Sequence, residues 1–176
     1  MNIIKVANAH VLLAGISNLQ IHDVTAFMNE LRSVSKSVAI QAVNADFIAC
    51  FQHILGILQQ STEAKKRGIL QSKRIEIDIL LRLACTDQID KALTDIGLKD
   101  GTNNVLVIAV GRMNHLKMLM KYIAANYDID DDILLPSKRR LKIISAFHDI
   151  GKTELNTLVN DSNKIASILV EHASLL

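Results

Sequence analysis

Two neighbouring side chains, His148 and Asp149, form the clearest catalytic pattern of the chain, within the pentapeptide HDIGK. An imidazole and a carboxylate side by side can help to hold a divalent metal ion, and such an ion activates water for hydrolysis. The same stretch also has the composition of a polar turn, because Phe147 ends an apolar run and Gly151 follows closely. We favour the turn over the metal site.

The pentapeptide resembles the central signature of HD-type metal-dependent phosphohydrolases. A site of that kind also needs a His upstream and an Asp well downstream, on other helices. His115 lies at a suitable distance before the pentapeptide, whereas Asp161 follows it too closely. Phosphohydrolase activity through His148 and Asp149 is therefore retained as the alternative function.

Other patterns that could support catalysis or metal binding are incomplete. The carboxylates of Asp128 and residues 130–132 could attract a hard cation, but they lack the spacing of a calcium loop. The glycine patterns of nucleotide-binding loops and the G-x-S-x-G nucleophile motif are absent. His53 lies among apolar residues, which favours a packed histidine over a ligand or a general base. We therefore predict no catalytic residue, no metal and no cofactor.

Basic residues form a more informative pattern. Five of them fall within ten positions around Gly68: Lys65, Lys66, Arg67, Lys73 and Arg74. Arg82 lies two turns beyond Arg74 on the same expected helix. A positively charged loop and helix edge of this kind can hold a phosphate backbone. An ordinary solvated charge run is the other interpretation, and the basic segment 138–142 leaves the same two interpretations open.

Two consecutive helices are expected to position these residues, within 74–98. Apolar residues of the first helix fall on two adjacent stripes at helical spacing: Ile77, Leu80, Leu81 and Ala84, and beside them Ile75, Ile79 and Leu83. We expect the first stripe to face the core, and Ile75 and Ile79 to lie with the basic residues on an exposed edge. The second helix is expected to begin at Thr86 and to end at Gly97.

The rest of the chain predicts three or four strands and, in total, about seven helices. Strands are expected in 3–16, as one bent strand or two short ones, in 37–43 and in 105–110, where VLVIAV is typical of a buried strand. Helices are expected in 23–33, from 44 or 46 to 61, in 114–126, and after Ser137, Thr153 and Ser162. These elements predict one α/β or α+β domain over residues 1–176.

Composition narrows the class of protein. Hydrophobic residues make up 49% of the chain and aromatic residues 3%, so the core must be aliphatic. A formal net charge of +2 is too small to indicate nucleic acid by itself, so any basic site must be local. Cys50 and Cys85 lack metal-ligand spacing, which is typical of core thiols in an intracellular protein. Neither a secretory signal nor a membrane-spanning run is evident, and we expect a cytoplasmic protein with no membrane partner.

Several degenerate motifs, taken in their order and spacing, resemble the PRPK-binding-protein family, the small non-catalytic subunit of the KEOPS (EKC) complex. These motifs are QAVNAD at 41–46 followed by His53, Glu76 with the segment 77–83, the block 88–98, the strand 105–111, and the segment 153–155 with the ending 168–176. The resemblance covers nearly the whole chain. One departure is His172, where the family more commonly has an Arg.

The resemblance implies a fold and a set of partners. The fold would be a small, mostly antiparallel sheet packed with helices. The protein would have no enzymatic activity of its own. The subunit would bind and stimulate a small atypical kinase/ATPase, bind tRNA, and act indirectly with the enzyme that makes threonylcarbamoyladenosine. Archaeal members of the family recruit tRNA through its 3′ CCA end, and this short chain, rich in Lys and Ile, looks archaeal.

The resemblance also implies two sets of site residues. A kinase interface would use the last helix, through Ile165, Ile168, Leu169 and His172, with the helix of His53 as the second candidate. An RNA-binding edge would use Lys65, Lys66, Arg67, Lys73, Arg74, Ile75 and Arg82. The basic side chains would bind phosphates, while exposed isoleucines would offer apolar faces to the bases.

Overall fold

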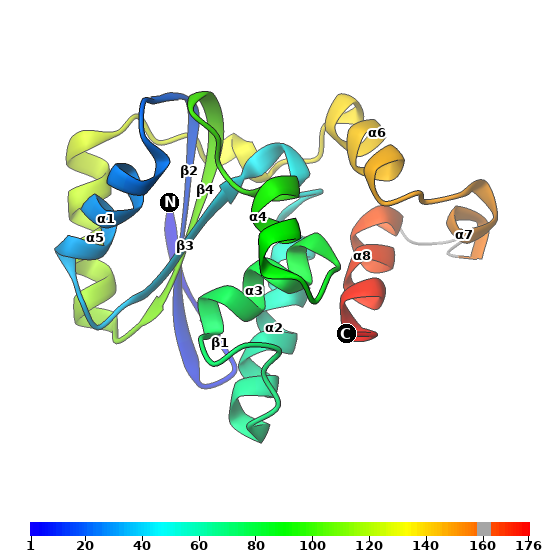
Figure 1. Cartoon of the computed structure of the whole chain (residues 1–176), viewed down its shortest axis with the longest axis horizontal. Helices are drawn as coiled ribbons and strands as arrows, with labels where there is room; N and C mark the ends of the chain where they lie inside the picture. The colour runs from blue at the N-terminus through cyan, green and yellow to red at the C-terminus, as the bar shows by residue number, and fades with distance from the viewer. Residues whose placement is uncertain (158–162) are drawn as a thin grey trace.

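A four-stranded antiparallel sheet forms the centre of the protein, as seen in the computed structural model, which describes residues 1–157 and 163–176 (Figure 1). The strands are β1 (Asn2–Val6), β2 (Ala9–Ile21), β3 (Ala39–Asn44) and β4 (Gly101–Gly111). Their order in the sheet is β1-β2-β4-β3, and every pair of neighbours is antiparallel. The expected α+β fold with a mostly antiparallel sheet is therefore confirmed.

The β1-β2 hairpin turns at Ala7 and Asn8, as the composition of segment 3–16 suggested. Ala7 has a φ of 49°, in the left-handed region that tight turns require. Further along β2, the pairing with β4 shifts register between Ile16 and Leu19, and Asn18 has a φ of 52°. β2 therefore continues to Ile21 through an irregularity that the sequence pattern did not predict.

Two helical layers cover the two faces of the sheet (Figure 1). One layer contains α1 (Val24–Val34) and α5 (Met113–Asn126); the other contains α2 (Phe51–Arg67), α3 (Ile75–Ala84) and α4 (Ile89–Ile96). The strand β4 shows why both layers are needed, because Leu106 and Ile108 join the core under α2 and α3, whereas Val105 and Val107 join the core under α1 and α5. A continuous apolar run is the pattern of a strand buried on both faces.

A C-terminal arm follows the sheet, and we use this name for α6 (Lys138–Phe147), α7 (Lys152–Thr157) and α8 (Lys164–Ser174). In Figure 1 the arm lies on the right, and α8 runs beside α2 and α3. The arm has a small apolar cluster of its own, formed with the start of α2: Ala49, Cys50, Ile144, Ile150, Ala166, Ile168 and Leu169.

Two short 3-10 helices complete the described chain, η1 (Ala45–Phe47) and η2 (Asp131–Leu134). They explain two differences from the expected helix boundaries. Asn44 caps η1 by accepting a hydrogen bond from the Asp46 amide, so α2 begins later, at Phe51. Part of the acidic segment around residues 128–132, for which no helix was predicted, forms η2, which Asp130 caps.

Other boundaries also differ from the sequence prediction. The fourth helix has its N-cap at Gln88 rather than Thr86, although the Thr86 hydroxyl accepts a hydrogen bond from the Gln88 amide at 3.3 Å. Ser162, which was predicted to cap the last helix, lies outside the described residues. None of the helices in residues 1–157 and 163–176 has the length and hydropathy needed to cross a membrane.

Candidate functional site

Five basic side chains form one exposed surface at the end of α2 and the loop that follows it. Lys65, Lys66 and Arg67 occupy the last turn of α2, where positive charge complements the negative end of the helix dipole. Gly68 ends the helix with a φ of 72°, a left-handed conformation that suits glycine. Lys73 and Arg74 then lie just before α3. All five residues are exposed, and we call this surface, residues 65–74, the basic surface.

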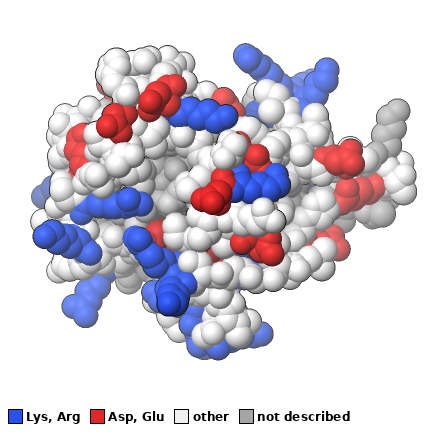
Figure 2. Space-filling model, viewed as in Figure 1, with Lys and Arg blue, Asp and Glu red and all other residues white. Residues whose placement is uncertain are grey.

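The charges of the basic surface are only partly neutralised. Glu63 contacts Arg67 at 2.7 Å and Lys66 at 3.9 Å, and Arg74 pairs with Glu76. Lys65 and Lys73 form no ion pair with any described residue. Both ammonium groups are therefore available to an anionic ligand. Figure 2 shows Lys and Arg side chains at the lower tip of the molecule, where the end of α2 lies in Figure 1.

A groove of about 410 Å³ lies beside this surface, between the end of α2 and the β1-β2 turn. The groove is lined by charged and by small residues, with Lys65 and Lys66 from α2 and the small residues of the turn. Ile75 contributes at its base, although only 4% of that residue is exposed. The basic surface therefore lies next to a groove, whereas an ordinary run of solvated charges would not.

Two residues predicted for the RNA-binding edge do not lie on the surface. Ile75 is 4% exposed and Arg82 is 7% exposed, and the neighbouring Ile79 is fully buried. The expectation that Ile75 and Ile79 are exposed is therefore wrong. Residues of both apolar stripes of α3 belong to one core cluster, with only Ile77 partly exposed, and α3 contacts α2, α4 and α8 as well as β3 and β4.

The exposed isoleucine of the basic surface is Ile69, which the sequence reasoning missed. Its side chain is 61% exposed directly after the Gly68 cap. The signal was available in the sequence, because Ile69 is an apolar residue after a glycine in an otherwise basic segment. An exposed β-branched residue beside cations has the character expected of a contact for an unstacked base.

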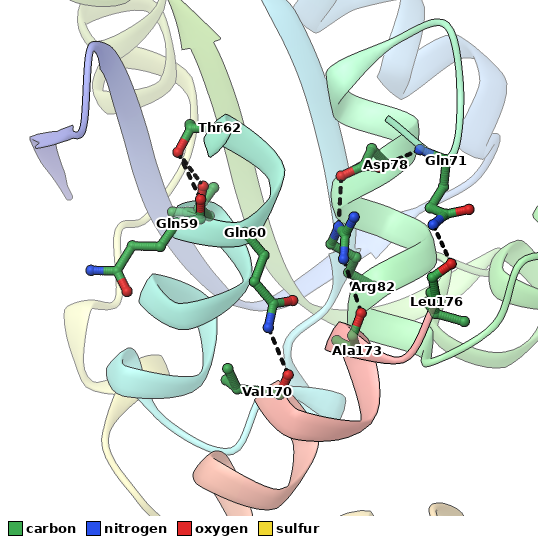
Figure 3. Close-up of polar contacts among 10 residues, drawn as sticks. Gln59, Gln60, Thr62, Gln71, Asp78, Arg82, Val170, Ala173 and Leu176 are labelled. Carbon is green, nitrogen blue, oxygen red and sulfur yellow. Dashed lines mark hydrogen bonds and ion pairs between the residues drawn. The ribbon is translucent and has the colours of Figure 1, made fainter. Parts of the chain in front are cut away.

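Arg82 has an interior role instead. Its Nε donates to Asp78 Oδ2 at 2.9 Å, and its Nη1 donates to the carbonyl of Ala173 at 2.9 Å (Figure 3). Asp78 is fully buried, so the guanidinium compensates a charge that would otherwise be costly in the interior. Arg82 thereby joins α3 to the carboxyl end of α8, whose last carbonyls have no partner within the helix.

The predicted kinase-contacting face of α8 also points inward. Ile168 is 1% exposed and Leu169 is fully buried, both in the apolar cluster of the arm. Ile165 and His172 are half-buried, and His172 Nε2 lies 2.6 Å from a carboxylate oxygen of Glu154. Because α8 uses this stripe to pack on the protein itself, Ile168 and Leu169 are not available to a partner in this conformation.

Two partly exposed apolar side chains lie on α6, beside basic residues. Ile143 and Phe147 lie one turn apart and are 42% and 38% exposed. Phe147 also packs edge-on against Phe47 of η1, with ring centroids 5.0 Å apart. Lys138, Arg139 and Lys142 are exposed on the same helix, and Figure 2 shows basic side chains projecting at the upper right, where α6 lies in Figure 1. This face of α6 is therefore both apolar and basic.

The phosphohydrolase alternative is not supported. The segment 148–151 is a turn that ends α6, with Asp149 exposed at a φ of 51°. His115 lies on α5, on the other side of the sheet, where its Nδ1 contacts the Ser37 hydroxyl. The other required residue, Asp161, falls outside the described residues. Within the described part of the chain, no three His, Cys, Asp or Glu side chains are grouped so that they could hold a metal ion.

The remaining candidates for chemistry have structural surroundings. His53 is fully buried, and burial, with repulsion from His148 second, lowers its pKa to about 3. Burial raises the pKa of the Cys85 thiol to about 11, which disfavours the thiolate needed by a nucleophile. In the acidic segment, Asp130 caps η2 and Asp131 pairs with the amino group of Met1.

Comparison with known proteins agrees with the resemblance in the sequence. Over 91 residues, the chain is 22% identical to the EKC/KEOPS complex subunit CGI121 of Yarrowia lipolytica, a match that covers 52% of this chain and 54% of that relative. The chain thus spans about half the length of the curated relative it matches. A family model described as kinase binding protein CGI-121 matches residues 16–174, which is most of the chain. The chain therefore belongs to the CGI-121 kinase-binding-protein family.

Proposed function

We propose that this protein is a non-enzymatic subunit of a KEOPS complex that binds the atypical kinase/ATPase of the complex. The family description and the name of the Yarrowia relative support kinase binding and membership of the complex. Among the described residues no His, Cys, Asp and Glu side chains are grouped for a metal ion, and burial disfavours the thiolate form of Cys85. The subunit would then act by contact, stimulating the kinase through its surface.

The exposed face of α6 is the kinase-docking surface that we propose. The observation that carries this assignment is the pair Ile143 and Phe147, two large apolar side chains one turn apart and partly exposed. Aromatic side chains at the centre of an interface often carry much of its binding energy, and Phe147 is such a group with Ile143 beside it. The basic residues Lys138, Arg139 and Lys142 would surround this apolar centre and favour a partner surface with acidic groups.

A binding assay with paired variants tests the surface. We expect the double substitution Ile143→Glu and Phe147→Ser to weaken kinase binding at least tenfold, measured by calorimetry on the purified proteins. The matched control is Ile89→Glu with Leu93→Ser on α4, where two apolar residues one turn apart are 42% and 45% exposed. Loss of binding in the control alone would indicate that the docking surface lies on α4. If the wild-type protein forms no complex with the kinase, the kinase-binding proposal is rejected.

We also propose that the basic surface recruits tRNA for threonylcarbamoyladenosine modification in the complex. The observation that favours this second role is the combination of the unpaired Lys65 and Lys73 with the exposed Ile69. Lysines next to an apolar contact and a groove suit a single-stranded RNA end, because phosphates and unstacked bases are then bound together. The 3′ CCA end of tRNA is such an end.

Fluorescence anisotropy with labelled tRNA tests this role. Lys65→Glu with Lys73→Glu should weaken binding at least tenfold, and binding by the wild-type protein should weaken as salt rises. The matched control is Lys117→Glu with Lys121→Glu, the same charge change at exposed positions on α5, which should keep wild-type affinity. Equal affinity for tRNA with and without its CCA end would refute recognition of that end.

A further inference from the structure

We propose that Asp78 and Arg82 are positioning residues that couple the basic surface to the carboxyl end of α8. The proposal rests on the proposed RNA-binding role of the basic surface. In this role, the buried ion pair keeps two segments that are distant in the sequence in one shared conformation.

The loop between α2 and α3, residues 68–74, is anchored to the protein interior through Asp78. The first amides of the loop, those of Gly68 and Ile69, bond back to the end of α2. Beyond them, the Gln71 amide donates to Asp78 Oδ1 at 2.7 Å. Because Asp78 is fully buried, this bond fixes the middle of an exposed loop to the inside of the molecule.

The same carboxylate is also linked, through Arg82, to the carboxyl end of α8. Asp78 Oδ2 accepts from Arg82 Nε, and Arg82 Nη1 donates to the Ala173 carbonyl, 91 positions further along the chain. The side chain of Gln71 closes the circuit by donating to the carbonyl of Leu176. Figure 3 shows the whole ring, which runs from the loop through Asp78 and Arg82 to α8 and back to the loop.

Burial makes the inner part of this ring, which contains Asp78, Arg82 and the Ala173 carbonyl, cooperative. A buried donor or acceptor that loses its partner costs much more free energy than an exposed one, so the bonds should open together rather than singly. A movement of α8 that releases Arg82 would change the orientation of Asp78 and free the Gln71 amide. By linkage, any ligand that orders the loop must also stabilise the docking of α8, and the reverse holds equally.

Hydrogen exchange on the full chain tests the coupling without RNA. Arg82→Lys keeps the buried positive charge, but an ammonium group lacks the fork that reaches both Asp78 and Ala173. We expect amides of residues 69–74 and of residues 173–176 both to exchange about tenfold faster. The matched control is Gln60→Ala, which removes the 2.7 Å bond from Gln60 to the Val170 carbonyl and should accelerate exchange in α8 alone.

Binding measurements complete the test and separate it from the proposed function. Arg82→Lys should weaken tRNA binding about fivefold or more, while Gln60→Ala should leave the affinity unchanged. In the wild-type protein, bound tRNA should protect residues 173–176, which needs no variant. Faster exchange in α8 alone for Arg82→Lys, with unchanged tRNA affinity, would overturn the coupling. Coupled exchange in a protein that binds no tRNA would support the coupling and reject only the RNA role.

Discussion

The sheet with its two helical layers and the C-terminal arm bury their side chains in different ways. The sheet lies between two large aliphatic clusters, and the residues of β4 from Val105 to Ala109 are at most 1% exposed. The arm has a small apolar cluster and also depends on side chains that donate to backbone carbonyls. Arg82 of α3 and Gln60 of α2 donate to carbonyls of α8, and Arg140 of α6 donates to the carbonyl of Ile133 in η2. Apolar contacts are non-directional, whereas these hydrogen bonds depend on the direction of donor and acceptor.

This difference indicates which part of the molecule can change conformation when a partner binds. Conformational change is found where a structure has few apolar contacts and depends on a limited number of specific bonds. The arm meets that description, and it carries the proposed kinase-docking face of α6. The sheet acts as the rigid support for both α6 and the basic surface. Substitutions in the two regions should therefore differ in how much unfolding free energy they remove and in which part of the molecule opens first.

The largest effect is expected from Arg82→Met, which removes the buried cation that joins α3 to the carboxyl end of α8. Asp78 would be left as an uncompensated charge in the interior, and breaking a buried pair on one side costs about 3–5 kcal/mol. Urea denaturation measures this loss of unfolding free energy. Adding Asp78→Leu should recover most of the loss, and a double variant as unstable as the single one would contradict this account.

A cavity in the sheet core should have a slightly smaller effect. Leu106 is fully buried on β4, and Leu106→Ala should lower the unfolding free energy by about 2–5 kcal/mol, nearer to 3 if the site relaxes. Hydrogen exchange should show that the whole molecule is destabilised, whereas Arg82→Met opens the arm first. The comparison of the two regions fails if both variants give the same exchange pattern.

Acid should weaken the contact between the arm and α2. The pKa of His53 is about 3 in the folded state and about 6.5 in the unfolded state. Below pH 6.5 the unfolded state therefore binds a proton that the folded state does not bind. The unfolding free energy should therefore fall by up to about 1.4 kcal/mol per pH unit as pH decreases toward 3.

His148 should add to the same trend. Its pKa is lowered to about 4, first by burial and then by His172, with Asp95 and Lys91 acting in opposite directions. The measurement is a series of urea denaturation curves between pH 7 and pH 4. His53→Gln should reduce the pH slope by about one proton. An unchanged slope in that variant would show that His53 does not carry the effect.

The smallest effect is expected at the close contact of α2 with α8. Gly56→Ala would raise helix propensity by about 1 kcal/mol, but the new methyl group would lie 2.5 Å from Val170 Cγ2. Overpacking costs about 1–3 kcal/mol, so we expect a small net loss, detectable as a lower melting temperature. Gly56→Ala with Val170→Ala removes the clash and should be at least as stable as the single variant. A stabilising single substitution would mean that α8 moves aside easily.

The sequence alone predicted the local elements well, because local elements depend on local chemistry. The unbroken apolar run at 105–110 indicated a strand buried on both faces, and β4 is buried on both. A helix was predicted from residue 23, and the Asp23 side chain caps α1 by accepting from the Ala26 amide at 2.9 Å. The expectation failed at the start of α2, where a cap residue at Asn44 serves a short 3-10 helix instead.

The candidate sites were predicted less well, since exposure is not a local property. Lys65, Lys66, Arg67, Lys73 and Arg74 lie together on the surface, as their close spacing indicated. Ile75 and Ile168 have the pattern of amphipathic helices, but a pattern of two apolar stripes does not say which stripe meets solvent. On α3 both stripes are largely buried, because the helix packs against the sheet and against α2, α4 and α8.

Sequence patterns were enough to predict most of the elements, the aliphatic core and the position of the basic segment. Each of these follows from periodicity, composition or spacing within a few residues. The interior position of Arg82, in contrast, depends on how distant segments pack in the folded chain. Its partner Ala173 is 91 positions away, and no local pattern encodes which buried carbonyl a guanidinium will meet when the chain folds.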